Sequence, residues 1–541
     1  MKLLSYFSKM LRIKLLFVSI LCSTLVMAQD FVLPDTNATN TEYYFNREIP
    51  IKSGKELTFI AYFFTQGVTA NYFPRNDFFQ GQVIGRLYGR STARSSDTTY
   101  TSFVEQRFLP FFLYTPKLMD GKVTLRASFE IDWTWGDASY GSGGNQGAGF
   151  NADFVNLQTQ NVEIEIVPAY GYAINFGLMR TFDSPYHPYR TTVDKLLDTG
   201  YRLMYWAGDA AGISFRHDFA RGSVSAGMFN LWENRIELRD DVWLYKAMGV
   251  YKAAPAFNIG GSVYHINDKS NGRGGASILG QGPKSLLTEY TGAYRFVFPD
   301  NDFETNVTWL GTFFDYNREY TYHNHKLSGF FNYNVGNIEG ETDRVADING
   351  FGLNARYGYR FGNTPDDQVT VDYLYTTGDE NGLEDDEYSG VITGNTWGAP
   401  GNLPVGMGTS VLFPSANVVN RYMPLISDIS NLGAGLNAVN IQVSKAVIPH
   451  KWILSSNVAY AMSNAALSRG GTEIGLEANF GVRWKIKTLM EIELRGAHVW
   501  LGDFYDAPYA NGDQFVDADD RLGARPVDPW TAYLAFKWLM F

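Results

Sequence analysis

The stretch from Lys122 to Thr134 reads KVTLRASFEIDWT, and its side chains alternate strictly between polar and apolar. Alternation with a period of two is typical of a β-strand whose two faces meet different environments. The run lasts 13 residues, whereas strands of soluble proteins average about five or six. A tilted strand that crosses a membrane needs about 9–11 residues, so this stretch favours a membrane strand.

Two further stretches, Ile474–Ile486 and Phe351–Phe361, alternate in the same way. In all three stretches the polar face carries ionisable side chains, which require a wet environment. A closed barrel satisfies every backbone hydrogen-bonding group in lipid and can still enclose water. We therefore predict an all-β fold, a transmembrane antiparallel β-barrel with polar side chains inside and apolar side chains outside.

The spacing of turn residues predicts the number of strands. Short turns rich in Pro, Gly, Asn and Asp alternate with long connections such as 136–157 and 378–432. Short periplasmic turns with long extracellular loops are the outer-membrane pattern, and single-chain barrels of this kind have even strand numbers. About 20 segments qualify, but the rhythm breaks between Val307 and Asp347, so we predict about 18 strands, with 16 and 20 as alternatives.

The N-terminus predicts export. A basic start precedes an apolar run from Leu15 to Val26, and Ala28 ends a small-residue cleavage site. We expect residues 1–28 to be a cleaved signal peptide, residues 29–54 an irregular periplasmic segment, and residues 55–541 the barrel. Outer-membrane lipids and the barrel-assembly machinery are the expected partners.

Composition excludes several other classes of protein. Cys22 is the only cysteine, so the predicted mature chain has no thiol for a disulfide, a redox pair or a nucleophile. Loss of four positive charges with the signal takes the net charge from −11 to −15, and this acidity argues against nucleic-acid binding. Aromatic residues make up 16% of the chain, and several tryptophans near segment ends, including Trp452, Trp500 and Trp538, fit interfacial girdles.

The candidate functional residues are the charged side chains on the inward face. Rings of charge in a lumen set the selectivity of a channel; the alternative is that these groups pair across strands and stiffen the wall. The residues predicted to line the pore are Arg126, Glu130, Asp132, Arg356, Arg360, Arg483, Lys485 and Arg495.

The longest connection, residues 378–432, spans 55 residues, and connections of this length are usually functional or disordered. We expect it to fold partly into the lumen, with an external flap as the alternative. No catalytic motif and no convincing metal-ligand spacing occurs in the sequence, so no cofactor, no metal site and no enzymatic activity are expected.

Residues Val371–Asp379 read VDYLYTTGD, and Phe413-Pro414 lies in the long connection that follows. Together with the strand Gly352–Phe361, these residues resemble the alginate-export family of outer-membrane porins. The resemblance implies a monomeric 18-stranded barrel for a polyanionic or sugar-like solute, with Arg356 and Arg360 lining the lumen. Inward acidic residues are as numerous as basic ones, which departs from a polyanion channel.

These observations predict a passive outer-membrane channel for hydrophilic solutes. Two alternatives remain at this stage. One is a structural or adhesive barrel with a plugged lumen, and the other is a barrel hydrolase.

Overall fold

The computed structural model describes residues 56–74, 82–86, 92–135, 156–182, 206–232, 241–269, 303–318, 320–340, 344–380, 385–392, 394–395, 408–413, 425–426, 429–466, 471–487, 489–506 and 525–540. The predicted signal peptide, 1–28, and the segment 29–54 lie outside these residues. The side chains of Glu130 and Asp132 lie outside them as well.

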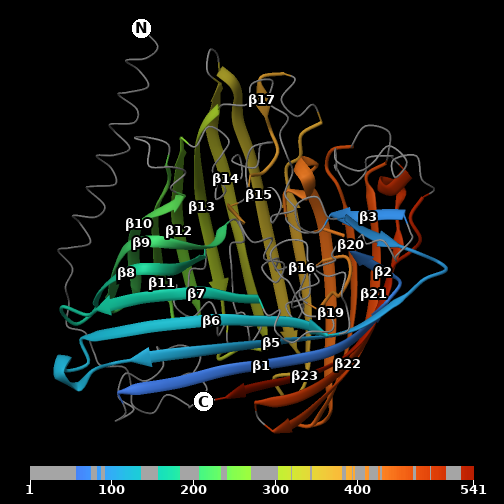
Figure 1. Cartoon of the computed structure of the whole chain (residues 1–541), viewed down its shortest axis with the longest axis horizontal. Coiled ribbons are helices and arrows are strands. Elements are labelled where there is room, and N and C mark those ends of the chain that lie inside the picture. Colours follow the sequence, from blue (N-terminus) through green and yellow to red (C-terminus); the bar gives the residue numbers. More distant parts are fainter. Residues whose placement is uncertain are drawn as a thin grey trace.

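Twenty of the described strands form one large sheet that closes on itself (Figure 1). Its members include two short loop pieces, β17 (Glu387–Tyr388) and β18 (Gly394–Asn395). The other 18 strands form the wall, and each pairs antiparallel with both of its neighbours. The first and last wall strands close the ring, with Ala61 opposite Met540. The prediction of an 18-stranded antiparallel barrel is therefore confirmed.

The wall strands run from 9 to 17 residues in length, long enough to cross a bilayer at a tilt. They are β1 (Leu57–Ala70), β5 (Thr101–Tyr114), β6 (Val123–Trp135), β7 (Asn156–Ile166), β8 (Tyr172–Phe182), β9 (Trp206–Phe219), β10 (Gly222–Trp232), β11 (Val242–Ala254), β12 (Phe257–Asp268), β13 (Phe303–Tyr316), β14 (His325–Gly340), β15 (Arg344–Arg360), β16 (Gln368–Thr376), β19 (Leu436–Ile448), β20 (Trp452–Met462), β21 (Glu473–Lys487), β22 (Met490–Leu501) and β23 (Trp530–Met540).

Smaller elements lie between the wall strands. A three-stranded sheet of β2 (Tyr72–Pro74), β4 (Thr92–Ser95) and β3 (Gln82–Arg86) follows β1. In the described part of the chain, three short 3-10 helices lie next to wall strands: η1 (Lys117–Met119), η8 (Asn431–Gly433) and η9 (Asp503–Asp506). Among the described residues, no helix is long and apolar enough to cross a membrane.

The two faces of the wall differ as the alternation predicts. On β21, Phe480 points outward and is 54% exposed, whereas Glu477 on the opposite face is fully buried. Leu494 on β22 and Leu534 on β23 are also more than half exposed and lie opposite each other in the ladder. A ring of exposed apolar side chains around a closed sheet is the surface that lipid requires.

The break in the loop rhythm has a simple cause. Strands β14 and β15 are joined by residues 341–343 only, a short connection at the end where the other connections are long. The preceding turn, 317–324, is the longer one and lies at the short-turn end. Strands β12 and β13 pair directly with each other over their whole length, and residues 269–302 connect them at the end of the barrel where most connections are long.

Exposed tryptophans mark both rims of the wall. Trp452 and Trp538 lie at the short-turn end and are 36% and 40% exposed, while Trp500 at the other end is 48% exposed. Trp452 stacks on Trp484 with ring centroids 5.6 Å apart. Amphipathic indole rings are favoured at the level of the lipid headgroups, as the girdle prediction requires.

Leu534→Arg is expected to destabilise the barrel by about 2–4 kcal/mol, because it places a charge on the lipid face near the middle of a strand. The measurement is urea unfolding of protein refolded into lipid vesicles. Tyr170→Arg is the control, because Tyr170 is similarly exposed, at 57%, but lies in the turn between β7 and β8. Equal losses in the two variants would show that the outer face of β23 does not meet lipid.

Candidate inner-wall channel site

The inner face of β6, β7 and β8 holds a buried cluster of charged groups. Arg126 on β6 donates from Nη2 to Glu165 Oε1 at 2.8 Å, and its Nη1 lies 3.8 Å from Glu163 Oε1. Asn175 Nδ2 on β8 donates to the other Glu165 oxygen at 3.4 Å. Ladder pairing brings these groups together, because Arg126 stands directly opposite Glu163. Arg126 is thus shared between two buried acidic side chains.

A second buried pair joins β15 and β16. Arg356 stands opposite Asp372 in the ladder, and its Nε donates to Asp372 Oδ2. Asn354 Nδ2 donates to Asp372 Oδ1 at 2.7 Å. Asp372 is only 2% exposed, so its charge depends on these donors.

Arg360, on the same face of β15, is arranged differently. Its guanidinium lies 4.3 Å above the ring of Tyr320, and Lys326 Nζ lies 4.9 Å from the same ring. Among the described residues it forms no ion pair, and its Nε is buried without a hydrogen-bond acceptor. Arg360 is therefore the predicted pore arginine whose charge is least neutralised by the wall.

Tyr320 reaches this position from the turn between β13 and β14. Its φ of 56° is left-handed, and Asn317 shapes the turn by donating from Nδ2 to the carbonyls of His323 and His325. Gly358 leaves room for the Tyr320 side chain, because a Cβ at position 358 would lie 2.3 Å from the Tyr320 hydroxyl oxygen. Burial raises the pKa of Tyr320 to about 12, although Arg360 and Arg356 act to lower it, so the phenol stays protonated at neutral pH.

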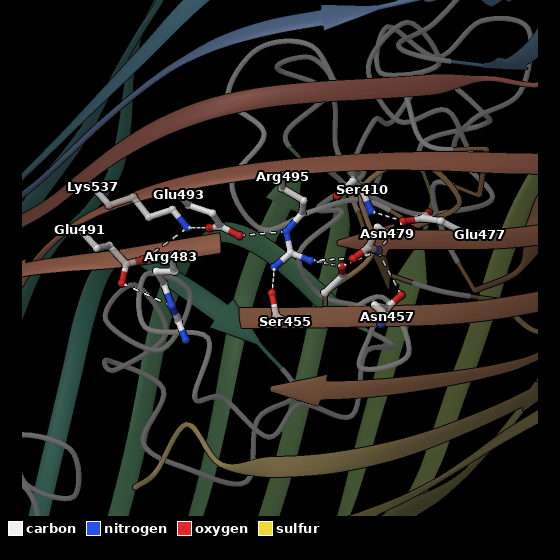
Figure 2. Close-up of polar contacts among 11 residues, drawn as sticks. Ser410, Ser455, Asn457, Glu477, Asn479, Arg483, Glu491, Glu493, Arg495 and Lys537 are labelled. Atoms are coloured by element: carbon white, nitrogen blue, oxygen red, sulfur yellow. Dashed lines mark hydrogen bonds and ion pairs between the residues drawn. The ribbon is translucent and has the colours of Figure 1, made fainter. Parts of the chain in front are cut away.

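The longest polar network follows β21, β22 and β23 along the inner wall (Figure 2). Glu493 accepts from Arg495 Nε at 2.9 Å and from Lys537 Nζ at 2.6 Å. Lys537 also lies 3.5 Å from Glu491, which in turn lies 3.9 Å from Arg483 Nε. Acidic and basic groups thus alternate along the wall.

Arg495 continues the network toward the neighbouring strands. Its Nη1 donates to Asn479 Oδ1 at 2.8 Å, and its Nη2 donates to Ser455 Oγ at 3.0 Å (Figure 2). At the short-turn end, Asp366 binds Arg483 Nη2 at 3.0 Å and Lys485 Nζ at 2.7 Å. Asp366 lies in the turn between β15 and β16, so this turn reaches inward as far as β21.

The long connection also folds onto the inner wall. Glu477 accepts hydrogen bonds from the backbone N–H groups of Ser410, Val411 and Leu412 at 2.8, 3.0 and 2.7 Å. Farther round the barrel, Trp309 Nε1 donates to the Ile392 carbonyl at 2.8 Å. The expectation that residues 378–432 fold partly into the lumen agrees with these contacts of the described loop residues.

The predicted pore residues thus fall into three groups. Arg126, Arg356, Arg483, Lys485 and Arg495 face the lumen and are paired with acids of the wall or its turns. Arg360 faces the lumen without such a partner, and the Glu130 and Asp132 side chains lie outside the described residues. The prediction omitted the partners Asp366, Asp372 and Lys537. Asp372 occupies an inward-facing position of β16, so the alternation of the strand could have predicted it. Asp366 lies in a turn, where side chains do not alternate.

A closed barrel with a lipid-facing apolar exterior and a charged interior is a transmembrane β-barrel of the bacterial outer membrane. No protein-family model matches the chain, and no curated protein matches it either.

Solved structures with a similar fold include outer-membrane proteins of two bacteria. OpdQ of Pseudomonas aeruginosa is 9% identical, with 89% of this chain and 97% of that chain covered and a TM-score of 0.45. OccAB4 of Acinetobacter baumannii is 10% identical over 90% and 99% of the two chains, with a TM-score of 0.46. OpdK of Pseudomonas aeruginosa, solved with vanillate, is 11% identical over 88% and 98%, with a TM-score of 0.43.

Proposed function

We propose that this barrel is a passive outer-membrane channel for hydrophilic solutes. The observation that supports the proposal is the inner wall itself, where charged and amide side chains of β21, β22 and β23 form a row of polar contacts (Figure 2). Such groups provide hydrogen bonds and a local electric field for water and polar solutes.

The solute class follows from the balance of these charges. Most described inward arginines are paired, so the wall does not form a continuous cationic surface. Arg360 and its neighbour Lys326 provide a local positive region at the short-turn end. We propose a weak preference for anionic or saccharide-like solutes, in keeping with the alginate-export resemblance, and insertion by the barrel-assembly machinery into outer-membrane lipid.

A second candidate function, a structural barrel with a plugged lumen, is favoured by one observation. Val411, Leu412 and Phe413 of the long connection are fully buried in a cluster that includes inward apolar side chains of the wall. A permanently packed cluster of this kind blocks the lumen, whereas a releasable one regulates it.

Single-channel recording of the refolded protein in planar bilayers tests the proposal. Stable conductance steps are expected, with a reversal potential that shows a weak anion preference. Arg360→Gln is expected to reduce this preference, because it removes the least neutralised inward charge, whereas the exposed outer-face variant Lys445→Gln is expected to leave it unchanged. Absence of conductance, also after deletion within residues 378–432, would favour the plugged barrel.

A further inference from the structure

We propose that Glu477 is a latch that holds the loop segment 408–413 against the inner wall and keeps the lumen constricted. The inference concerns the docking of this segment. Only its consequence for conduction rests on the proposed channel function.

The latch depends on the geometry of one carboxylate. Oε1 of Glu477 accepts from the Ser410 N–H at 2.8 Å, and Oε2 accepts from the Val411 and Leu412 N–H groups at 3.0 and 2.7 Å. Three consecutive N–H groups that converge on one carboxyl group form a backbone nest. A single wall side chain therefore accepts three of the hydrogen bonds that dock this segment.

A second contact fixes the start of the segment. The Gly408 carbonyl accepts from Asn479 Nδ2 at 2.9 Å and from Arg495 Nη1 at 3.0 Å. Gly408 has a φ of +85°, and a Cβ there would lie 2.8 Å from Gln442 Nε2. This left-handed backbone conformation favours glycine at the point where the loop meets the wall.

The segment held by Glu477 also binds a second part of the long connection, residues 425–426. The N–H groups of Leu425 and Ile426 donate to the carbonyls of Val411 and Leu412, both at 3.0 Å. Ile426 is 2% exposed. Residues 425–426 are therefore attached to the segment that Glu477 holds.

Glu477 differs from the other buried acids of the inner wall in what it binds. Glu163, Asp372 and Glu493 each pair with an arginine or lysine of the wall. Glu477 instead accepts hydrogen bonds from the loop backbone and from Asn479 Nδ2. Its position therefore serves to attach a loop, whereas the other acids tie one strand to the next.

Site-directed labelling tests the latch, and the chain suits this method because its only cysteine, Cys22, lies in the predicted signal peptide. Ser410→Cys keeps the backbone N–H and replaces a buried hydroxyl with a thiol. In folded barrels, the thiol is expected to react slowly with a bulky water-soluble maleimide. Adding Glu477→Gln, which places amide hydrogens against the nest, is expected to speed labelling at least about tenfold, the equivalent of 1.4 kcal/mol.

Glu163→Gln is the matched control, because Glu163 is an equally buried acid of the inner wall that does not bind the loop. Tyr100→Cys, at a position that is 70% exposed, reports the reactivity of a free thiol. Folding of each variant is checked by heat-modifiable mobility, the difference in migration between unheated and heated samples on a gel. If Glu477→Gln does not fold, Asn479→Ala, which removes a donor to Gly408, is labelled instead.

Faster labelling with Glu477→Gln and not with Glu163→Gln supports the latch. Equal acceleration in both, or none in either, overturns it. Planar-bilayer recording of Glu477→Gln then addresses the channel separately: a larger open probability is expected. If the latch variant labels quickly and no variant conducts, the proposed function fails while the latch stands.

Discussion

Glu493→Gln is expected to lower the free energy of unfolding of the barrel by about 3–5 kcal/mol, the range for breaking one side of a buried ion pair. Glu493 is 5% exposed and binds both Arg495 and Lys537. The amide keeps the shape of the side chain but removes its charge. Two largely buried cations then lose their nearest anion.

Glu491→Gln is the control for this prediction. It makes the same chemical change on the same strand, but Glu491 lies farther from its cations, at 3.5 and 3.9 Å, and its side chain is 21% exposed. Exposed pairs contribute about 0–1 kcal/mol. Urea unfolding of vesicle-refolded protein, followed by tryptophan fluorescence, measures both variants; a loss with Glu491→Gln as large as that with Glu493→Gln would contradict this account of the network.

Arg356→Gln is expected to cost a similar amount, about 3–5 kcal/mol, because it leaves the buried Asp372 without its guanidinium partner. The double variant Arg356→Gln/Asp372→Asn is expected to recover most of this loss, since it buries two neutral amides that can bond to each other. The same unfolding measurement applies to both variants.

Arg360→Gln provides the comparison on the same strand, because Arg360 has no ion-pair partner among the described residues. It is expected to change stability by less than about 1 kcal/mol, and to act on ion selectivity instead. If the double variant is no more stable than Arg356→Gln alone, the cost does not come from the unpaired acid.

Most of the fold followed from local pattern. The alternation in Lys122–Thr134 and Ile474–Ile486 assigned each side chain to a face, and burial confirms this for Phe480 and Glu477. Such assignment works because neighbouring side chains on a strand point to opposite faces whatever the rest of the chain does. The even strand number followed from barrel closure. The short connection 341–343 could not be recognised, because the lengths of turns and loops carry no periodicity.

The partners of the inward charges were not predictable in the same way. Arg126, Arg356 and Arg495 were expected inside and lie there, but the choice between free pore charges and paired wall charges depends on which strands become neighbours and in what register. Arg356 meets Asp372 because β15 pairs with β16 in one alignment. A shift of one residue would turn each of these groups to the opposite face.

Features that depend on residues close in the sequence could therefore be predicted, whereas contacts between residues far apart in the sequence required the tertiary structure. Periodicity and composition predicted an outer-membrane barrel of about 18 strands with an apolar exterior and a charged interior, because these features depend on the spacing of residues that are close in the sequence. Only the folded chain brings Asp366 to Arg483, 117 positions away, and Ser410 to Glu477, 67 positions away. Those contacts form when the sheet closes and a turn and a loop fold into the space that it encloses. Local sequence patterns do not indicate which residues so far apart in the sequence will meet.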